Sequence, residues 1–262
     1  MEALDRRRQA GLINDIIKDL LPTALAGISD DELKEAGVTL DELMVRCEYN
    51  GVPCDLEKDF QHILDRRYGN CYTFQRNVTV GAKDIGQGLH LRMKISPHEY
   101  LSCSETVGAR ILVHDAQVYP LPHVEGFTAP PGFNSRYTFG YEETRLLGSP
   151  FPPCVAEKNI STYPLPGKYS QKNCEELCIQ RALADQCACT DPLKPRLYNV
   201  SNCGFAKKRC MDHFLQSHRA FHNAYCAECH PACVYRDISF TGTRLVWPSR
   251  NKASSFLPIF YL

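Results

Sequence analysis

The sequence lacks several features that would place it in a common class of protein. Its 262 residues carry no formal net charge at neutral pH. A neutral chain is a poor match for nucleic acid, because phosphate binding needs a concentrated basic surface. No run of about 20 apolar residues occurs, so no part of the sequence is expected to span a bilayer. The first residues also lack the apolar stretch of a secretory signal peptide.

Catalytic motifs are missing as well. The sequence contains no nucleophile elbow, no phosphate-binding Walker loop, no dinucleotide fingerprint and no His-Glu-x-x-His motif. Its nine histidines are scattered, and the nearest to a cluster are His213, His218 and His222. Such a group usually lies on the solvent-facing side of a helix. We therefore expect no enzymatic activity, no catalytic residues and no cofactor.

Cysteine, in contrast, is abundant. Of the fourteen cysteines, four lie in the first half of the chain and ten lie between positions 154 and 233. This density is typical of zinc binding in a cytosolic protein and of disulfides in an extracellular one. Glycosylation sequons that begin at Asn77, Asn159 and Asn199 favour the extracellular interpretation. Since no signal peptide is visible, we expect a fragment whose missing ends carry targeting and anchoring.

The stretch around Cys226 and Cys229 leaves two other interpretations open. Two cysteines separated by two residues suit tetrahedral zinc, but the rest of the sequence offers no second pair with that spacing. Cys187 and Cys189, for example, are separated by a single residue. A catalytic thiol pair would need a strand before it and a helix after it, whereas this pair follows a predicted helix. We expect neither a metal site nor a redox site here.

Hydrophobic periodicity divides the chain into helical and extended parts. Ile13, Ile17 and Leu20 recur at helical spacing, which predicts helices over residues 1–47. Alternating patterns then predict four strands, at residues 71–75, 89–95, 108–114 and 137–147. A segment that contains several glycines separates the first two, which are therefore expected to form a hairpin.

Residues 154–233 are expected to form a separate, disulfide-rich helical module. Cys174, Cys178 and Arg181 stand at positions i, i+4 and i+7, which places both cysteines on one helical face. A second helix is predicted over residues 212–225. Two helices of this size bury little apolar surface, so cross-links must supply much of the stability. After Cys233 the pattern becomes strand-like again.

Several stretches together carry a family resemblance: residues 47–54, 68–74, 108–114 and 130–133, the cysteine spacing from Cys174 to Cys233, and Trp247-Pro248-Ser249. They resemble the extracellular domain of the degenerin/epithelial sodium channel family, which includes the acid-sensing channels. The resemblance implies an α+β fold with a mixed palm β-sheet, peripheral finger helices and a disulfide-rich helical thumb. The regions would be a finger-like helical part at 1–70, palm and β-ball strands at 71–153, the thumb at 154–233 and a returning palm strand at 234–262.

The resemblance also implies six disulfides. These are Cys47–Cys54, Cys154–Cys233, Cys174–Cys229, Cys178–Cys226, Cys187–Cys210 and Cys189–Cys203. Cys71 and Cys103 stay unassigned, because the family's counterpart of Cys71 pairs with a cysteine just beyond a first transmembrane helix that this sequence does not include. If residues 71–75 and 89–95 form the expected hairpin, these two thiols could approach each other across it.

The function implied by the resemblance is that of a ligand- or mechanically gated, amiloride-sensitive sodium channel subunit. The intact subunit would sit in the plasma membrane with this segment outside, would join homo- or heterotrimers with other subunits and would pass sodium ions. An extracellular ligand or matrix would be a further partner, and nucleic acid is not expected to bind. A soluble, secreted, disulfide-rich binding module is the alternative from another class.

Two details refine this expectation. Trp247, Pro248 and Ser249 would couple movements of the extracellular domain to the pore, although Trp247 would also suit a packed position at the end of a strand. Asp212 falls where acid-sensing members gather carboxylates, but Gln216 occupies the next turn. Gating by protons at that place is therefore not expected, and the sequence does not reveal the stimulus.

Overall fold

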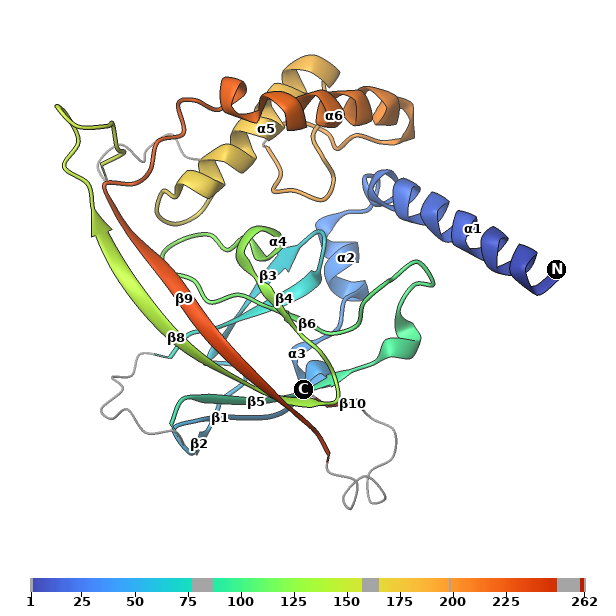
Figure 1. The fold of residues 1–262 in the computed structure, drawn as a ribbon, viewed down its shortest axis with the longest axis vertical. Helices are drawn as coiled ribbons and strands as arrows, with labels where there is room; N and C mark the ends of the chain where they lie inside the picture. Colours follow the sequence, from blue (N-terminus) through green and yellow to red (C-terminus); the bar gives the residue numbers. More distant parts are fainter. Residues whose placement is uncertain (1, 77–86, 157–164, 198, 249–259, 262) are drawn as a thin grey trace. The chain divides into compact units, whose positions relative to one another are not determined.

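Helices and antiparallel strands are mixed along the chain in this computed structural model, which describes residues 2–76, 87–156, 165–197, 199–248 and 260–261 (Figure 1). Together with six disulfides, this content confirms an α+β, disulfide-rich fold. The chain forms two compact units, each assembled from separated stretches. Unit 1 comprises Met1–Glu32, His114–Leu121 and Tyr141–Ile238, and unit 2 comprises Leu33–Val113, Pro122–Gly140 and Ser239–Leu262.

Three helices open the chain: α1 (Glu2–Leu25), α2 (Asp30–Ala36) and α3 (Leu40–Leu43). Reciprocal side-chain and backbone hydrogen bonds cap the last two, between Ser29 and Glu32 for α2 and between Thr39 and Glu42 for α3. These bonds lower the pKa of both glutamates. Strands replace helices from Met44 onward, so the expectation of a helical region at 1–70 is wrong beyond α3.

A four-stranded antiparallel sheet forms one part of unit 2, in the order β10 (Phe260–Tyr261), β5 (Leu89–Ile95), β1 (Met44–Tyr49) and β2 (Val52–Pro53). Asn50 and Gly51 both have positive φ, of 51° and 77°, as a two-residue hairpin turn requires. Met44, Cys47 and Met93 form the buried core of this part.

The consecutive strands β3 (Phe60–Asp65) and β4 (Gly69–Phe74) form an antiparallel hairpin. The predicted hairpin between residues 71–75 and 89–95 is therefore wrong, since β4 pairs with β3 and β5 pairs with β1. The short turn between β3 and β4 costs less closure entropy than the longer connection to β5. Asn70 and Tyr72 of β4 donate hydrogen bonds to the carbonyl oxygen of Val38, which fixes the segment between α2 and α3.

Shorter elements complete unit 2: a 3₁₀ turn (Pro97–Glu99), β6 (Ala109–Ile111), α4 (Pro122–Glu125) and β7 (Phe127–Ala129). β6 pairs with β7 and is shorter than the strand predicted at 108–114. The guanidinium of Arg110 donates to the carbonyl oxygen of Pro122, 2.8 Å away, and so holds the connection between the two strands.

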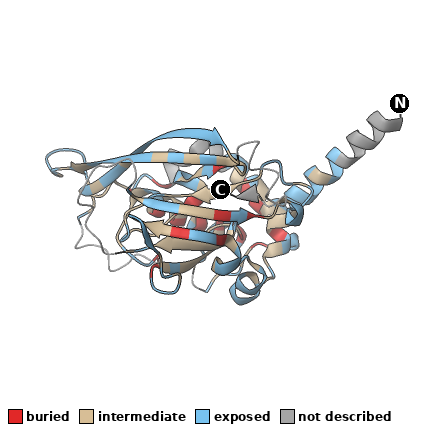
Figure 2. Cartoon of the chain, turned by 90° about the horizontal axis from the view of Figure 1, so that it is seen from below, coloured by how far each residue is buried: buried red, intermediate tan, exposed pale blue. Residues whose placement is uncertain are grey.

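The longest strands are β8 (Phe133–Arg145) and β9 (Val234–Val246), which form a two-stranded ribbon. β8 confirms the strand predicted near 137–147. In unit 2, four rings cluster around the ribbon with centroids 4.4–6.3 Å apart: Phe127, Tyr137, Phe139 and Phe240. Many of the ribbon's other residues are exposed (Figure 2).

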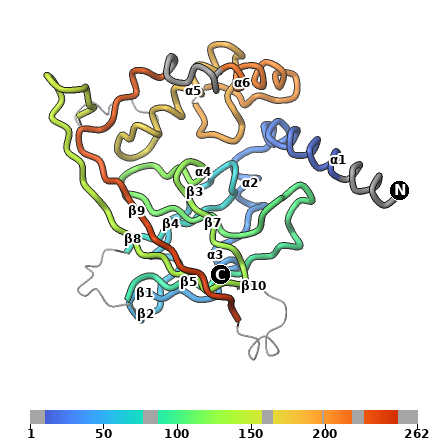
Figure 3. Tube along the Cα trace, viewed as in Figure 1, coloured from blue at the N-terminus to red at the C-terminus, as the bar shows by residue number. Residues whose placement is uncertain are grey.

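Two antiparallel helices dominate unit 1, α5 (Gln171–Cys187) and α6 (Lys208–Tyr225), the second preceded by a 3₁₀ turn (Phe205–Lys207). Both helices were predicted, and the chain trace shows them packed together (Figure 3). The hydroxyl oxygen of Ser170 caps α5 by accepting a hydrogen bond from the amide of Asn173. Leu183, Phe214 and the two cysteines Cys189 and Cys203 are almost fully buried, so sulfur atoms form part of this core.

Candidate functional site: a disulfide-bonded helical module and the strands it joins

The functional residues expected in residues 154–233 gather in one module of unit 1. Cys174 and Cys178 lie one turn apart on α5, and each is bonded to a cysteine just after α6, Cys229 and Cys226 respectively. The Cα atoms are 5.6 and 5.9 Å apart, within the usual range for disulfides. The shared helical face predicted from their spacing thus meets the end of the second helix.

Three further bonds extend the ladder in both directions: Cys187–Cys210, Cys189–Cys203 and Cys154–Cys233. All five module bonds are nested, because each lies between the two cysteines of the next. With Cys47–Cys54 of unit 2, they are the pairs that the family resemblance implies. A single disulfide typically adds about 2–4 kcal/mol to stability, so the ladder is a major source of the module's rigidity.

The disulfides of Cys226 and Cys229 bear on the two other interpretations of these residues, a zinc site and a catalytic thiol pair. Both sulfurs are bonded to α5, so they are available neither as zinc ligands nor as a catalytic thiol pair. No group of three or more potential metal ligands occurs among the residues that the structure describes. His213 is exposed on α6, whereas the side chains of His218 and His222 lie outside the described part of the chain.

The loop between the helices is fastened to α5 by a buried amide. Gln180 is fully buried; its side-chain nitrogen donates to the carbonyl oxygens of Asp191 and Pro195, and its oxygen accepts from the amide of Asp191. Lys194 forms an ion pair with Glu176 of α5 at 2.7 Å. Buried amides satisfied in this way add specificity to the fold, and here they leave the loop little freedom.

At its other end the module is joined to the ribbon. Cys154, shortly after β8, is bonded to Cys233, the residue before β9. Backbone hydrogen bonds reinforce the junction: Leu146 donates to Cys233 at 2.8 Å, and Cys233 donates to Val155 at 2.9 Å. The two strands therefore enter and leave the module through one cross-linked point.

A loop that contains residues 114–121 packs against the start of α5. The amide of Lys168 donates to the carbonyl oxygen of Gln117, and the side chain of Asn173 donates to that of Tyr119 at 3.1 Å. Gly167 is required at this contact, because its φ is +104° and a Cβ atom would lie 2.4 Å from the oxygen of Gln117. This loop is thus attached to the module independently of the disulfides.

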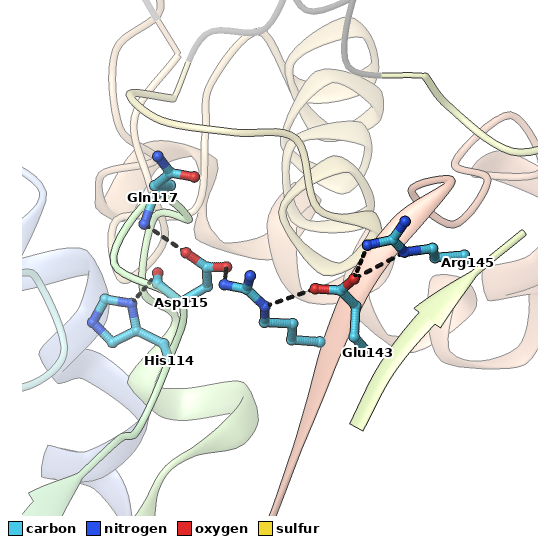
Figure 4. Close-up of polar contacts among 6 residues, drawn as sticks. His114, Asp115, Gln117, Glu143 and Arg145 are labelled. Carbon is cyan, nitrogen blue, oxygen red and sulfur yellow. Dashed lines mark hydrogen bonds and ion pairs between the residues drawn. The ribbon is translucent and has the colours of Figure 1, made fainter. Parts of the chain in front are cut away.

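Arg236 on β9 connects this loop with β8 (Figure 4). Its guanidinium lies 3.1 Å from a carboxylate oxygen of Asp115 and 3.3 Å from one of Glu143. Arg145 donates two hydrogen bonds to Glu143, at 2.9 and 2.7 Å. We call Asp115, Glu143, Arg145 and Arg236 the Arg236 network. Hydrogen bonding from Arg145, together with that from Arg236, lowers the pKa of Glu143.

A shallow groove of about 510 Å³ lies beside α6, lined among others by Asp19, Lys208, Asp212 and Gln216. The ammonium group of Lys208 is 2.9 Å from Asp19 and 2.6 Å from Asp212. Burial lowers the pKa of Lys208, but its hydrogen bonds to Asp212 and Asp19 outweigh that effect and raise it. Asp212 thus faces a fixed cation here.

Comparisons of the sequence with known proteins identify the family. A family model described as amiloride-sensitive sodium channel matches residues 15–259. Degenerin unc-8 of Caenorhabditis elegans is 28% identical over 253 residues, which are 93% of this chain and 33% of that protein. Degenerin mec-10 of the same organism is 26% identical over 241 residues, 89% of this chain and 33% of that protein. The chain belongs to the amiloride-sensitive sodium channel family.

Membership of the amiloride-sensitive sodium channel family confirms the resemblance drawn from the sequence. The family is one of ion channels, which are not enzymes. Degenerin-like protein unc-105 of C. elegans is 33% identical over 178 residues, 66% of this chain and 20% of that protein. The chain spans about a third of the length of the first relatives named. In the part that the structure describes, no helix is both long and apolar enough to cross a membrane.

The remaining predicted residues are Trp247, Pro248, Ser249 and the three sequon asparagines. Trp247 is half-buried in unit 2, and its amide donates to the carbonyl oxygen of Gly132 at 2.9 Å. Pro248 is half-buried too, while Ser249 lies outside the described residues. Of the three sequons only Asn199 is described; it is exposed in a turn with a φ of 63°, and Asn77 and Asn159 lie outside.

Cys71 and Cys103 are both free thiols. The hairpin that would have brought them together does not form, so the expectation that they approach each other loses its basis. Burial and the negative charge of Asp65 raise the pKa of Cys71 to about 12. Its thiol therefore stays protonated at neutral pH.

The Arg236 network was not predicted from the sequence. Its members come from positions 115, 143, 145 and 236, and no local pattern connects them. Only the regular alternation of charged residues on a strand, Glu143 and Arg145, could have suggested that part of it. Long-range ion pairs of this kind depend on the fold and become visible with the structure.

Proposed function

We propose that this chain is the extracellular part of a subunit of an amiloride-sensitive sodium channel. Its family membership and its degenerin relatives support the channel class. Its many disulfides and the exposed sequon at Asn199 support an extracellular position in the plasma membrane protein. The intact subunit would join a homo- or heterotrimer with other family members and pass sodium ions down their gradient.

In this proposal the disulfide-bonded module is the thumb, the sheets of unit 2 belong to the palm, and the N-terminal helices belong to the finger. The observation that carries the proposal is the junction between module and ribbon. Five nested disulfides stiffen the module, and Cys154–Cys233 attaches it to β8 and β9. The Arg236 network ties both strands to the loop that contains residues 114–121, which is hydrogen-bonded to the start of the module. A pull or a ligand acting on the module would therefore be passed to the strands.

The stimulus we propose is an extracellular ligand or mechanical force, not protons. Proton sensing through the groove would need carboxylates that share a proton near neutral pH. Asp212 instead pairs with Lys208, which also contacts Asp19, and Gln216 is the neighbour one turn on. Asp212 and Asp19 thus each face the ammonium group of Lys208 and not a second carboxylate with which to share a proton.

The complete coding sequence provides the first test. We expect two apolar segments of about 20 residues, one before Glu2 and one after Leu262. The full-length subunit, expressed in oocytes alone or with a second family member, should carry a sodium current that amiloride blocks. A transcript with a cleavable signal peptide that stops near Leu262 would overturn the channel proposal. A secreted, disulfide-rich binding module would then be the better account.

The junction can be tested in the same full-length subunit. Arg236→Ala removes both ion pairs that connect β9 to the loop and to β8, so the response to the stimulus should fall several-fold at equal surface expression. Arg145→Ala is the matched comparison, because it removes the ion pair with Glu143 inside β8 and leaves both ion pairs of Arg236 in place. Equal currents from the two variants would show that the ion pairs of Arg236 do not transmit the stimulus.

A further inference from the structure

The pairing of β1 with β5 places two positive charges opposite each other. Arg46 of β1 is the direct cross-strand partner of Arg92 of β5. Like charges at such positions destabilise a sheet. Arg46 forms an ion pair with Glu48 on its own strand and is largely exposed. Arg92 is half-buried and needs a different partner.

That partner is the indole ring of Trp247. The guanidinium carbon of Arg92 lies over the ring, 5.4 Å from its centroid. This distance is within the range of a cation–π interaction, which is strongest with tryptophan and gains when the pair is shielded from water. The amide of Trp247 is held as well, by its hydrogen bond to Gly132 just before β8. Trp247 thus contacts the sheet with its ring and the ribbon with its backbone.

We propose that Arg92 is a positioning residue, which fixes the indole of Trp247 and so ties the end of β9 to the β1–β5 sheet. Repulsion from Arg46 favours this contact, because it disfavours a position of the Arg92 guanidinium close to Arg46. The Arg92 side chain then holds Trp247, the residue after β9. Resting on the proposed function, the inference extends to gating: breaking this contact changes how far movement of β9 reaches the sheet, and thereby the balance between closed and open channels.

Intrinsic fluorescence tests the contact directly, because the chain contains a single tryptophan. In the purified 262-residue chain, Arg92→Met keeps the length of the side chain but removes the charge. We expect its tryptophan emission to shift to longer wavelength and acrylamide quenching to increase at least twofold. Arg92→Lys, which retains a cation, should restore much of the native emission.

Arg46→Lys is the matched control, because it keeps the positive charge opposite Arg92 and changes a side chain that pairs with Glu48 on its own strand. Its spectrum should match that of the unchanged chain. If Arg92→Met also gives the native spectrum and quenching, Arg92 does not hold the indole and the inference is wrong. If Arg92→Met fails to fold, Arg92→Lys and Arg92→Gln test the contact instead. Acrylamide should quench the tryptophan of Arg92→Lys less than that of Arg92→Gln, and equal quenching would contradict the inference.

Currents from the full-length subunit test the extension to gating. Arg92→Met and Trp247→Phe should each change the open–closed equilibrium by about 2- to 30-fold, the range of one cation–π contact. The double variant should add little to either change. Unchanged gating in both would overturn the extension. No current from the unmodified subunit would instead count against the proposed function, while the fluorescence result would still decide the contact.

Discussion

Unit 1 and unit 2 hold their elements together by different means. In unit 1, five nested disulfides run through or beside the core, and Cys189 and Cys203 are themselves fully buried. In the described part of unit 2 the one disulfide, Cys47–Cys54, closes a short loop of sequence separation 7. The rest of unit 2 depends on backbone pairing, an aromatic cluster and single contacts such as Arg92 with Trp247.

This difference shows where the molecule can move. Covalent cross-links between α5 and the segment after α6 do not open by thermal motion, whereas packing contacts and exposed hydrogen bonds exchange readily. The module of unit 1 is therefore stiff, and the contacts of unit 2 rearrange at lower cost.

Removing one disulfide from each unit compares them directly. Cys154→Ala with Cys233→Ala should lower the free energy of unfolding of unit 1 by about 3–4 kcal/mol, because with Cys174–Cys229 intact that bond still closes a loop of 79 − 55 = 24 residues. Cys47→Ala with Cys54→Ala should cost about 2 kcal/mol, because its loop is short. Denaturant unfolding followed by hydrogen exchange measures both. Equal losses would contradict the view that cross-links matter more in unit 1.

The aromatic cluster is the corresponding non-covalent feature of unit 2. Phe127 contacts three rings, so Phe127→Ala should destabilise unit 2 by about 1–3 kcal/mol, less than a fully buried phenylalanine would. Exchange should accelerate in residues 133–140 and stay slow in α5. The control is Phe205→Ala, at a side chain that is 61% exposed, with an expected effect below about 0.5 kcal/mol. Faster exchange in both units would argue against their independence.

The free thiol of Cys71 reports on the compactness of unit 2. Its pKa of about 12 means that the native state keeps a proton that the unfolded chain releases above about pH 8.5. The contribution of this group to stability should therefore decrease as the pH rises from about 8.5 toward 12. In a Cys103→Ala background, alkylation at pH 8 should be much slower for the folded chain than for the chain in urea. Similar rates would show that Cys71 is accessible.

The smallest effect is expected for acid at the Arg236 network. The pKa of Glu143 is lowered, so its contribution to stability is complete above the pKa of the unfolded chain, about 4.3, and disappears as the pH falls through the lower native value. The difference in stability between the unmodified chain and Glu143→Gln should be constant from pH 8 to about 5. A difference that changes near pH 6.5 would contradict this assignment.

Local signals in the sequence were sufficient for the helices of unit 1. The spacing of Cys174 and Cys178 predicted a shared face, and this face carries two of the disulfides. The choice of partners was not derivable from spacing, because ten cysteines allow many pairings; it came from the family resemblance. Capping residues such as Thr39 likewise mark helix starts that periodicity alone places only roughly.

Strand pairing in unit 2 was predicted less well. Residues 71–75 and 89–95 both read correctly as strands, yet each pairs with an earlier strand instead of with the other. Alternation shows which residues face one side of a sheet but not which strand lies next to it. The contact of Arg92 with Trp247 depends on the position of β5, and the Arg236 network depends on the pairing of β8 with β9, so neither could be predicted.

The nested order of the disulfides has a consequence for proteolysis. A cut of the backbone between Cys189 and Cys203 would leave the two pieces joined by all five bonds of the module, while a cut between Cys154 and Cys174 would leave them joined by Cys154–Cys233 alone. A protease acting at the tip of the module would therefore nick the chain without releasing anything. The same enzyme acting near the junction would leave one bond between the two parts of the chain.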